Sequence, residues 1–318
     1  MFGVAANSYN LQIRPMLVLR RTNNHFGVID GSQLNPELLN RLSLTELSAF
    51  PIHTDHGLAE LRDLFEVIQG EPANEPLLVL VGDCGAVDGI GTGLQRGTIC
   101  VLGSVGHSTA KEMQGGMLIV VGNAKDQLGC GMRDGTIYIM GDCGNQMGAP
   151  MPGRKSGMRG GDIIIAGSAG DRACERMRRG TVFVARSLGT HAASQMIAGT
   201  LVAMGDIGSE WGGGMRRGSI ILGKDSLAES TATMSEPREF ELSFLPLVWR
   251  HLEKLQNEAL SVLNDVVERE EMRASGFKIP PPVQIPRTRW VQRQIADLNF
   301  DGRGEILVLR RMSSLGVV

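Results

Sequence analysis

One short phrase decides the fold of this chain: Met132-Arg133-Asp134-Gly135-Thr136-Ile137-Tyr138-Ile139. It consists of a Met or Leu, two residues, a Gly, one residue, an aliphatic residue, one residue and a second aliphatic residue. Copies begin at Leu94, Met113, Met132, Met158, Met177, Met196 and Met215. Their glycines, spaced by 19, 19, 26, 19, 19 and 19 residues, are Gly97, Gly116, Gly135, Gly161, Gly180, Gly199 and Gly218. We expect these seven glycines to be the structural positions of a repeat.

The period predicts a stack of repeats. A period of about 20 residues with one short strand per repeat is typical of a solenoid, in which each repeat packs only on its neighbours. The two aliphatic positions of each strand, such as Ile137 and Ile139, point to one side because side chains alternate along a strand. Parallel stacking of identical phases gives a parallel β-helix. The sequence therefore predicts an all-β core with about seven to eight coils and a repeat of about 19 residues.

The remaining sequence divides into two flanking parts. Residues 1–76 mix strand and short helix patterns and predict a small α/β cap, because the open end of a solenoid exposes its apolar cross-section. Residues 77–225 form the predicted β-helix. Residues 226–318 begin with a polar linker and continue with apolar residues at helical spacing over about 244–273, followed by an extended, proline-rich tail.

The strand position between the two aliphatic columns is also apolar, with Tyr138, Ile164, Phe183 and Val202 in successive repeats. A sheet face in water would carry polar residues at this position. Something must therefore cover this outer column. The chain's own C-terminal segment, a partner protein or both could do so, and we treat the four residues as a candidate partner interface.

Two further columns follow the repeat. The methionines that open the copies are expected to fill the core at an irregular corner, in preference to forming a soft-metal ladder.

Arginines precede the key glycines and include Arg178, Arg179, Arg216 and Arg217. This stripe is either a solvated edge that prevents lateral aggregation or a docking site for an acidic partner or polyanion. The extra residues at 145–157 predict a surface loop.

The sequence offers little chemistry of its own. It contains no CxxC or GxSxG motif, and its two Asp-Cys-Gly triplets at 83–85 and 142–144 fall about three coils apart. At ~4.8 Å per coil they are too distant to bind one metal ion. We therefore expect no catalytic, cofactor-binding or metal-binding residues in this chain.

Composition excludes several classes of partner. The net charge of −2 gives no support for nucleic-acid binding. The sequence contains no run of 18 apolar residues, which a membrane-spanning helix would require. The five scattered cysteines are typical of reduced thiols in a cytoplasmic protein.

The repeat resembles the GXGXG β-helix of the C-terminal domain of the glutamate synthase large subunit. Nearly the whole chain resembles the C-type subunit of formylmethanofuran dehydrogenase, on the segments 64–67, 177–180 and 304–307. Its tail is similar to that of the bacterial relatives, whose complex acts as a formyltransferase/hydrolase in tetrahydromethanopterin-linked formaldehyde oxidation.

The resemblance implies a right-handed β-helix that carries no catalytic residue or cofactor and holds other subunits. It implies three partners, namely an amidohydrolase-type subunit, a molybdopterin-enzyme-like subunit, and a formyltransferase subunit. Zinc, and possible molybdopterin or tungstopterin and iron–sulfur clusters, would belong to those partners. One alternative is a glutamate-synthase-type β-helix that lines an ammonia or metabolite channel. A β-helix enzyme with its own site is a third reading, disfavoured because polar residues do not converge.

Overall fold

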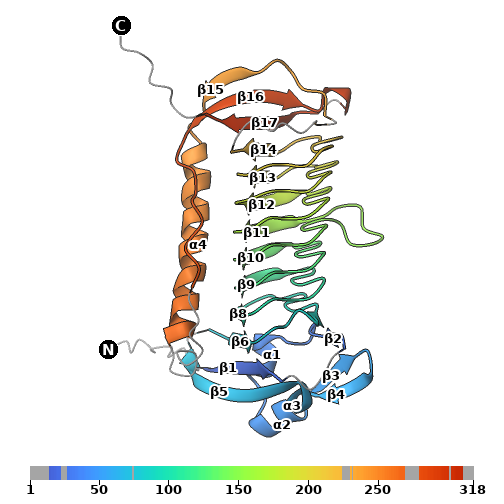
Figure 1. Cartoon of the computed structure of the whole chain (residues 1–318), viewed down its shortest axis with the longest axis vertical. Helices are drawn as coiled ribbons and strands as arrows, with labels where there is room; N and C mark the ends of the chain where they lie inside the picture. The colour runs from blue at the N-terminus through green and yellow to red at the C-terminus, as the bar shows by residue number, and fades with distance from the viewer. Residues whose placement is uncertain are drawn as a thin grey trace, which may run out of the picture.

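The computed structural model describes residues 14–22, 27–73, 75–223, 230, 232–268, 279–300 and 302–310. Over these ranges the chain is mostly β, with one large sheet that is mainly parallel and with few helices. Figure 1 shows the strands stacked as rungs along the long axis, with one long helix beside them. No helix in the described ranges is long and apolar enough to cross a membrane. Residues 226–229 and 231 of the predicted linker, 269–273 of the predicted helix and 274–278 of the predicted tail lie outside the described residues.

The central part of the large sheet is a parallel stack in which equivalent residues of successive repeats lie opposite one another. Ile137, for example, pairs with Leu118 on one side and with Ile163 on the other. The strands of this stack are β6 (Leu77–Val81), β8 (Thr98–Leu102), β9 (Gln114–Val120), β10 (Asp134–Ile139), β11 (Arg159–Ile165), β12 (Arg179–Val184), β13 (Thr200–Ala203) and β14 (Ser219–Leu222). The repeat read from the sequence thus sets the register of the strands.

Antiparallel strands close both ends of the stack. At one end, β1 (Arg14–Arg21) pairs in parallel with β6, and β5 (Phe65–Ala73) pairs antiparallel with β1. At the other, β17 (Gly304–Leu309) continues the stack after β14, followed by the antiparallel strands β16 (Trp290–Ala296) and β15 (Arg238–Glu241). Both ends that a stack of repeats would expose are therefore covered.

Smaller elements surround the N-terminal end. A second sheet has the order β4-β3-β2-β7, with β2 (Ile29–Asp30), β3 (Pro51–Thr54), β4 (Gly57–Glu60) and β7 (Val87–Asp88). The short helices are α1 (Pro36–Leu39), α2 (Leu44–Ser48) and α3 (Leu61–Leu64), and a 3-10 helix η1 (Leu298–Phe300) lies between β16 and β17. The division of the chain into three domains stays a prediction.

Each repeat also contributes one residue to a second parallel row of bridges. This row joins Cys84, Val105, Ala124, Cys143, Ala169, Leu188 and Ile207 in turn. Aliphatic side chains of the sheet and of this row form one continuous buried cluster. The cluster includes the six methionines that open the repeats, all fully buried: Met113, Met132, Met158, Met177, Met196 and Met215. The expectation that the methionines are core residues is thus confirmed.

The seven repeat glycines let the repeats approach closely. All have φ between +72° and +111°, a region that favours glycine. A Cβ at Gly161 would lie 2.7 Å from the carbonyl oxygen of Gly135 and 2.7 Å from the Cε of Met132. The methionine of an earlier repeat approaches Gly180 and Gly199 in the same way. These glycines therefore pack against the methionines of the preceding repeats.

Candidate functional site

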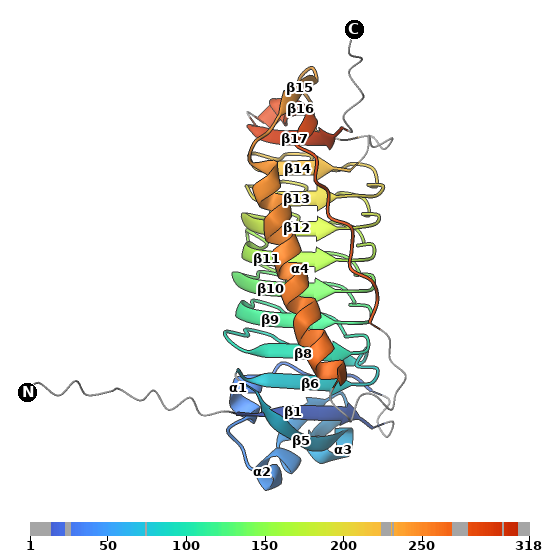
Figure 2. The same cartoon turned by 90° about the vertical axis from the view of Figure 1, so that its left-hand side faces the viewer.

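The outer face of the sheet is covered by the chain's own helix α4 (Leu245–Glu268). Figures 1 and 2 show this helix lying along the stack. Tyr138 is 1% exposed beneath it, and Ile164, Phe183 and Val202 are 0% exposed. They pack with helix residues that recur at helical spacing, among them Leu245, Trp249, Leu252, Leu255, Ala259, Leu263 and Val266. The expectation that these four residues face a partner is corrected, because the chain itself covers them.

A buried amide fastens α4 to the sheet and to the extended segment that follows the helix. The Tyr138 hydroxyl donates a hydrogen bond to Gln256 Oε1 at 3.2 Å. The same oxygen accepts from the Val283 N–H at 2.9 Å, and Gln256 Nε2 donates to the Val283 carbonyl oxygen at 3.2 Å. Trp249 Nε1 donates to the Thr288 carbonyl oxygen at 2.8 Å. The sequence did not single out Gln256, because a polar residue in an amphipathic helix is expected to face water.

The arginine stripe differs between its two ends. Near the N-terminal end, Arg96 Nη2 lies 3.1 Å from Glu37 Oε1. Toward the C-terminal end, the arginines are exposed and, within the described part of the chain, form no ion pair with a carboxylate: Arg178, Arg179, Arg216 and Arg217. The stripe thus offers guanidinium groups without a carboxylate partner among the described residues over its last repeats, whereas Arg96 is paired. That these four arginines contact a partner stays a prediction.

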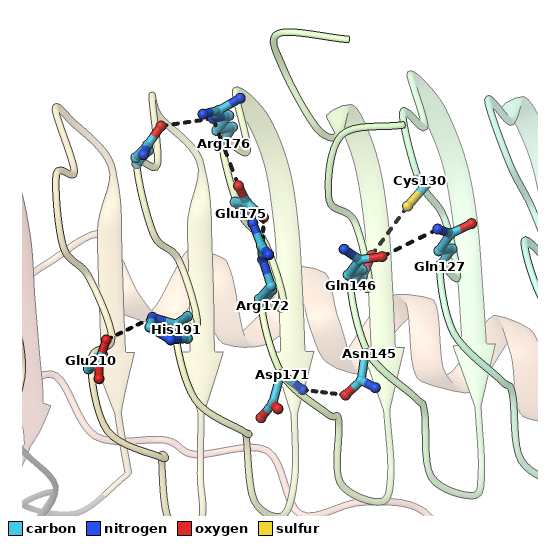
Figure 3. Close-up of polar contacts among 11 residues, drawn as sticks. Gln127, Cys130, Asn145, Gln146, Asp171, Arg172, Glu175, Arg176, His191 and Glu210 are labelled. Carbon is cyan, nitrogen blue, oxygen red and sulfur yellow. Dashed lines mark hydrogen bonds and ion pairs between the residues drawn. The ribbon is translucent and has the colours of Figure 1, made fainter. Parts of the chain in front are cut away.

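A ladder of polar side chains runs along the turns between repeats. Oδ1 of Asp126 accepts from the Asn145 N–H, Oδ1 of Asn145 from the Asp171 N–H, and Oδ1 of Asp171 from the Thr190 N–H, each at 2.8 Å. Figure 3 shows the Asn145 to Asp171 step. A Cβ at Gly144 would lie 2.2 Å from Asp126 Oδ1. These carboxylate and amide groups therefore hold neighbouring repeats together and require the glycines that face them.

The described cysteines are all buried and free. Burial raises the pKa of Cys84, Cys100, Cys130 and Cys174 to about 12, and it raises the pKa of Cys143 as well. A buried thiol that keeps its proton at neutral pH is a poor nucleophile. Across the described ranges, no three or more His, Cys, Asp or Glu side chains form a group that could hold a metal ion.

A groove of about 830 Å³ opens on the turn side of the last repeats. The groove is lined by Lys155 of the 145–157 loop, by Arg176 and Arg216 of the stack, and by Phe300 of η1. The sequence indicated the loop and Arg216 as surface features. It gave no signal for Arg176 or Phe300, because the repeat pattern does not place η1 beside these turns.

Two comparisons with known proteins found matches, one to a family and one to a solved structure. Residues 90–236 match the family described as GXGXG motif. A chain in the crystal structure of the formyltransferase/hydrolase complex from Methylorubrum extorquens, determined in complex with methylofuran, is 29% identical. That match covers 92% of this chain and 100% of the other, with a TM-score of 0.73. No curated protein matches the chain. The two matches confirm the resemblance predicted from the sequence.

Proposed function

We propose that this chain, whose residues 90–236 carry the GXGXG motif, is a non-catalytic scaffold subunit of a formyltransferase/hydrolase complex in one-carbon metabolism. The observation that carries the proposal is the match to a chain of the Methylorubrum extorquens complex, which covers 100% of that chain and 92% of this one. The GXGXG repeat alone would not distinguish this role from that of other proteins that share it. A similarity over this share of the chain includes the flanking elements as well.

We infer that the repeats form a right-handed parallel β-helix. The inference is supported by the in-register parallel strands and by the second row of bridges with the same period. Helix α4 covers its outer column, and the hydrogen bonds of the polar ladder join the turns of neighbouring repeats. Such a body suits a scaffold, because each repeat is held by its neighbours and long surfaces remain for partners.

The chemistry would then reside in partner proteins. We propose an amidohydrolase-type subunit with zinc, a molybdopterin-enzyme-like subunit, and a formyltransferase subunit. If the parent complex carries out redox chemistry, molybdopterin or tungstopterin and iron–sulfur clusters would also be bound by these partners. The four exposed arginines of the stripe are the proposed docking site for an acidic partner surface, because guanidinium groups bind carboxylates in a bidentate manner.

The filled interior disfavours the channel alternative. A β-helix that conducts ammonia needs an open path, whereas the side chains inside the described stack, such as Met132, Ile137 and Ile163, are fully buried against one another. A path along the outer face would have to displace α4. We therefore favour the scaffold over the channel.

Purification from the native host tests the proposal. The tagged chain is expressed at low level and purified in moderate salt, and the co-purifying proteins and metals are identified. A formyltransferase and an amidohydrolase-like protein, with zinc and without molybdenum or tungsten, would support the hydrolytic complex. Molybdenum or tungsten together with iron would identify a redox complex instead. A lone chain, or glutamate synthase subunits, would overturn the proposal.

A matched pair of charge reversals tests the arginine stripe. Arg178→Glu is expected to reduce the recovery of at least one partner protein. Arg96→Glu is the control, because Arg96 is already paired with Glu37 and lies at the other end of the stripe. Equal recovery with both variants would contradict the docking role.

A further inference from the structure

The floor of the 830 Å³ groove is built from successive layers of the stack. The Arg176 N–H donates to the Ser194 carbonyl oxygen at 2.9 Å, and the Gln195 N–H donates to the Gly213 carbonyl oxygen at 2.7 Å. Three layers at ~4.8 Å each make a floor on the order of 10 to 14 Å long. This length fits about four residues of an extended peptide at ~3.3 Å per residue.

The walls of the groove carry cations that the chain itself does not neutralise. Lys155 and Arg216 are exposed and form no ion pair with a carboxylate in the described ranges. Arg176 donates from Nε to the Gln195 Oε1 at 2.8 Å, and its Nε lies 3.9 Å from Oε1 of Glu175. Figure 3 shows Arg176 and Glu175 at this turn. Two of the three cations in the groove are thus available to a ligand, and the third is weakly paired.

One carboxylate also lines the groove, but its oxygens are occupied. Asp297 is fully buried. Its Oδ2 accepts from the Gly214 N–H at 3.1 Å, and its Oδ1 accepts from the N–H groups of Thr233 at 2.9 Å and Asn299 at 3.2 Å. Because three backbone donors bind this carboxylate, it anchors the C-terminal segment to the last repeat. Among the described residues that line the groove, the accessible charge is therefore positive.

Apolar surface accompanies the cations. Phe300 is 65% exposed although it is aromatic, and the half-buried Ile197 also lines the groove. Aromatic residues and arginine are enriched at the centres of protein interfaces relative to the rest of the surface. A ligand of this groove should therefore bring both carboxylates and an apolar group.

We propose that the groove binds an extended acidic segment of a partner protein, with two carboxylates four residues apart and an apolar side chain midway between them, so that all three side chains lie on one face of the segment. The carboxylates would engage Arg176 and Arg216, which are two layers apart, at ~10 Å. The apolar side chain would pack on Phe300. The inference rests on the proposed function in one respect: the acidic segment is taken to belong to another member of the complex.

Fluorescence anisotropy on the purified full-length chain tests the groove directly. The probe is a labelled hexapeptide with two glutamates four positions apart and one leucine midway between them. We expect saturable binding that weakens as salt is raised, and about tenfold weaker binding after Arg216→Glu. Arg217→Glu is the matched control, because this neighbour is also exposed and its reversal changes the net charge equally but it does not line the groove. Phe300→Ala should weaken binding without changing the salt dependence.

Several outcomes would overturn the inference. These are equal weakening by the two charge reversals, equal affinity for an all-glutamate hexapeptide that lacks the leucine, or no binding of any acidic probe. Tighter binding of a single-stranded oligonucleotide would assign the groove to nucleic acid and contradict the proposal. Co-purification separates this test from the proposed function. An assembled complex without peptide binding would refute the groove alone, whereas peptide binding by a chain without formyltransferase partners would refute only the function.

Discussion

The hydroxyl of Tyr138 on β10 donates a hydrogen bond to Gln256 on α4, and both side chains are nearly fully buried, at 1% and 6% exposure. Because Gln256 also bonds both backbone groups of Val283, one amide joins the sheet, the helix and the tail segment. An apolar contact would hold α4 against the sheet in several positions. The buried hydrogen bonds select one, because displacing the helix would leave these polar groups without partners.

Replacing Gln256 is expected to be more costly than replacing Tyr138. Gln256→Leu leaves the Tyr138 hydroxyl and the backbone of Val283 unpaired, so we expect a loss of about 2 to 4 kcal/mol in the free energy of unfolding. Tyr138→Phe keeps the Val283 bonds and should cost about 1 kcal/mol. Chemical denaturation followed by circular dichroism measures both. Asn257→Ala, at the exposed neighbour on the same helix, is the control and should cost less than about 0.5 kcal/mol. Equal losses for Gln256→Leu and Asn257→Ala would contradict the role of the amide.

The repeat could be predicted from the sequence because each contact between neighbouring repeats joins residues at equivalent positions. Ile137 meets the equivalent residue of each neighbour, and the spacing of the glycines already states which residues are equivalent. The short helix patterns predicted within residues 1–76 have a local cause as well: at Leu44–Ser48 the side chains of Ser43 and Glu46 form a capping box.

What covers the outer column could not be predicted. An amphipathic pattern shows that α4 has an apolar face, but it does not say which surface that face contacts. A helix of the same chain and a partner protein satisfy the same pattern. The arginine stripe was visible in the sequence because it follows the repeat. The groove was not, because Phe300 and Arg176 come together only through the C-terminal segment, which lies outside the repeat.

Substituting a repeat glycine should be far more damaging than substituting a loop glycine with the same backbone angle. Gly161 and Gly153 have φ of +82° and +77°, so alanine meets similar backbone strain at both. A Cβ at Gly161 would in addition collide with the Gly135 carbonyl oxygen at 2.7 Å, whereas nothing lies within 4 Å at Gly153. We expect Gly153→Ala to cost about 1 kcal/mol and Gly161→Ala at least about 3 kcal/mol, measured by urea denaturation. Similar losses for the two variants would show that packing between repeats does not depend on this glycine.

Glycine should stabilise the turns in which other residues adopt a left-handed conformation. Glu112 has φ of +51°, and its carboxylate makes one weak contact, 3.9 Å from Arg154. Glu112→Gly removes the strain of about 1 to 2 kcal/mol, part of which is offset by the greater freedom of glycine in the unfolded chain. We expect a net gain of about 0.5 to 1 kcal/mol. Glu112→Ala is the control, since it removes the same carboxylate and keeps the strain. A gain with alanine equal to that with glycine would rule out backbone strain as the cause.

The folded chain should lose stability as the pH rises above 9. Burial raises the pKa of Cys100 from 9.0 to about 12, so between these values the folded state keeps a proton that the unfolded state has released. Stability falls wherever the folded state binds more protons, by up to about 1.4 kcal/mol per pH unit for one thiol. Cys84, Cys130 and Cys174 add to the effect in the same window, and Tyr138, whose pKa is raised from 10.0 to about 12, adds to it above pH 10. Urea denaturation with reductant at pH 7 to 11 measures the slope, and Cys100→Ala should reduce the slope by the share of one thiol. An unfolding free energy that stays constant up to pH 11 would mean that these groups titrate alike in both states, and hence that they are not buried in the folded chain.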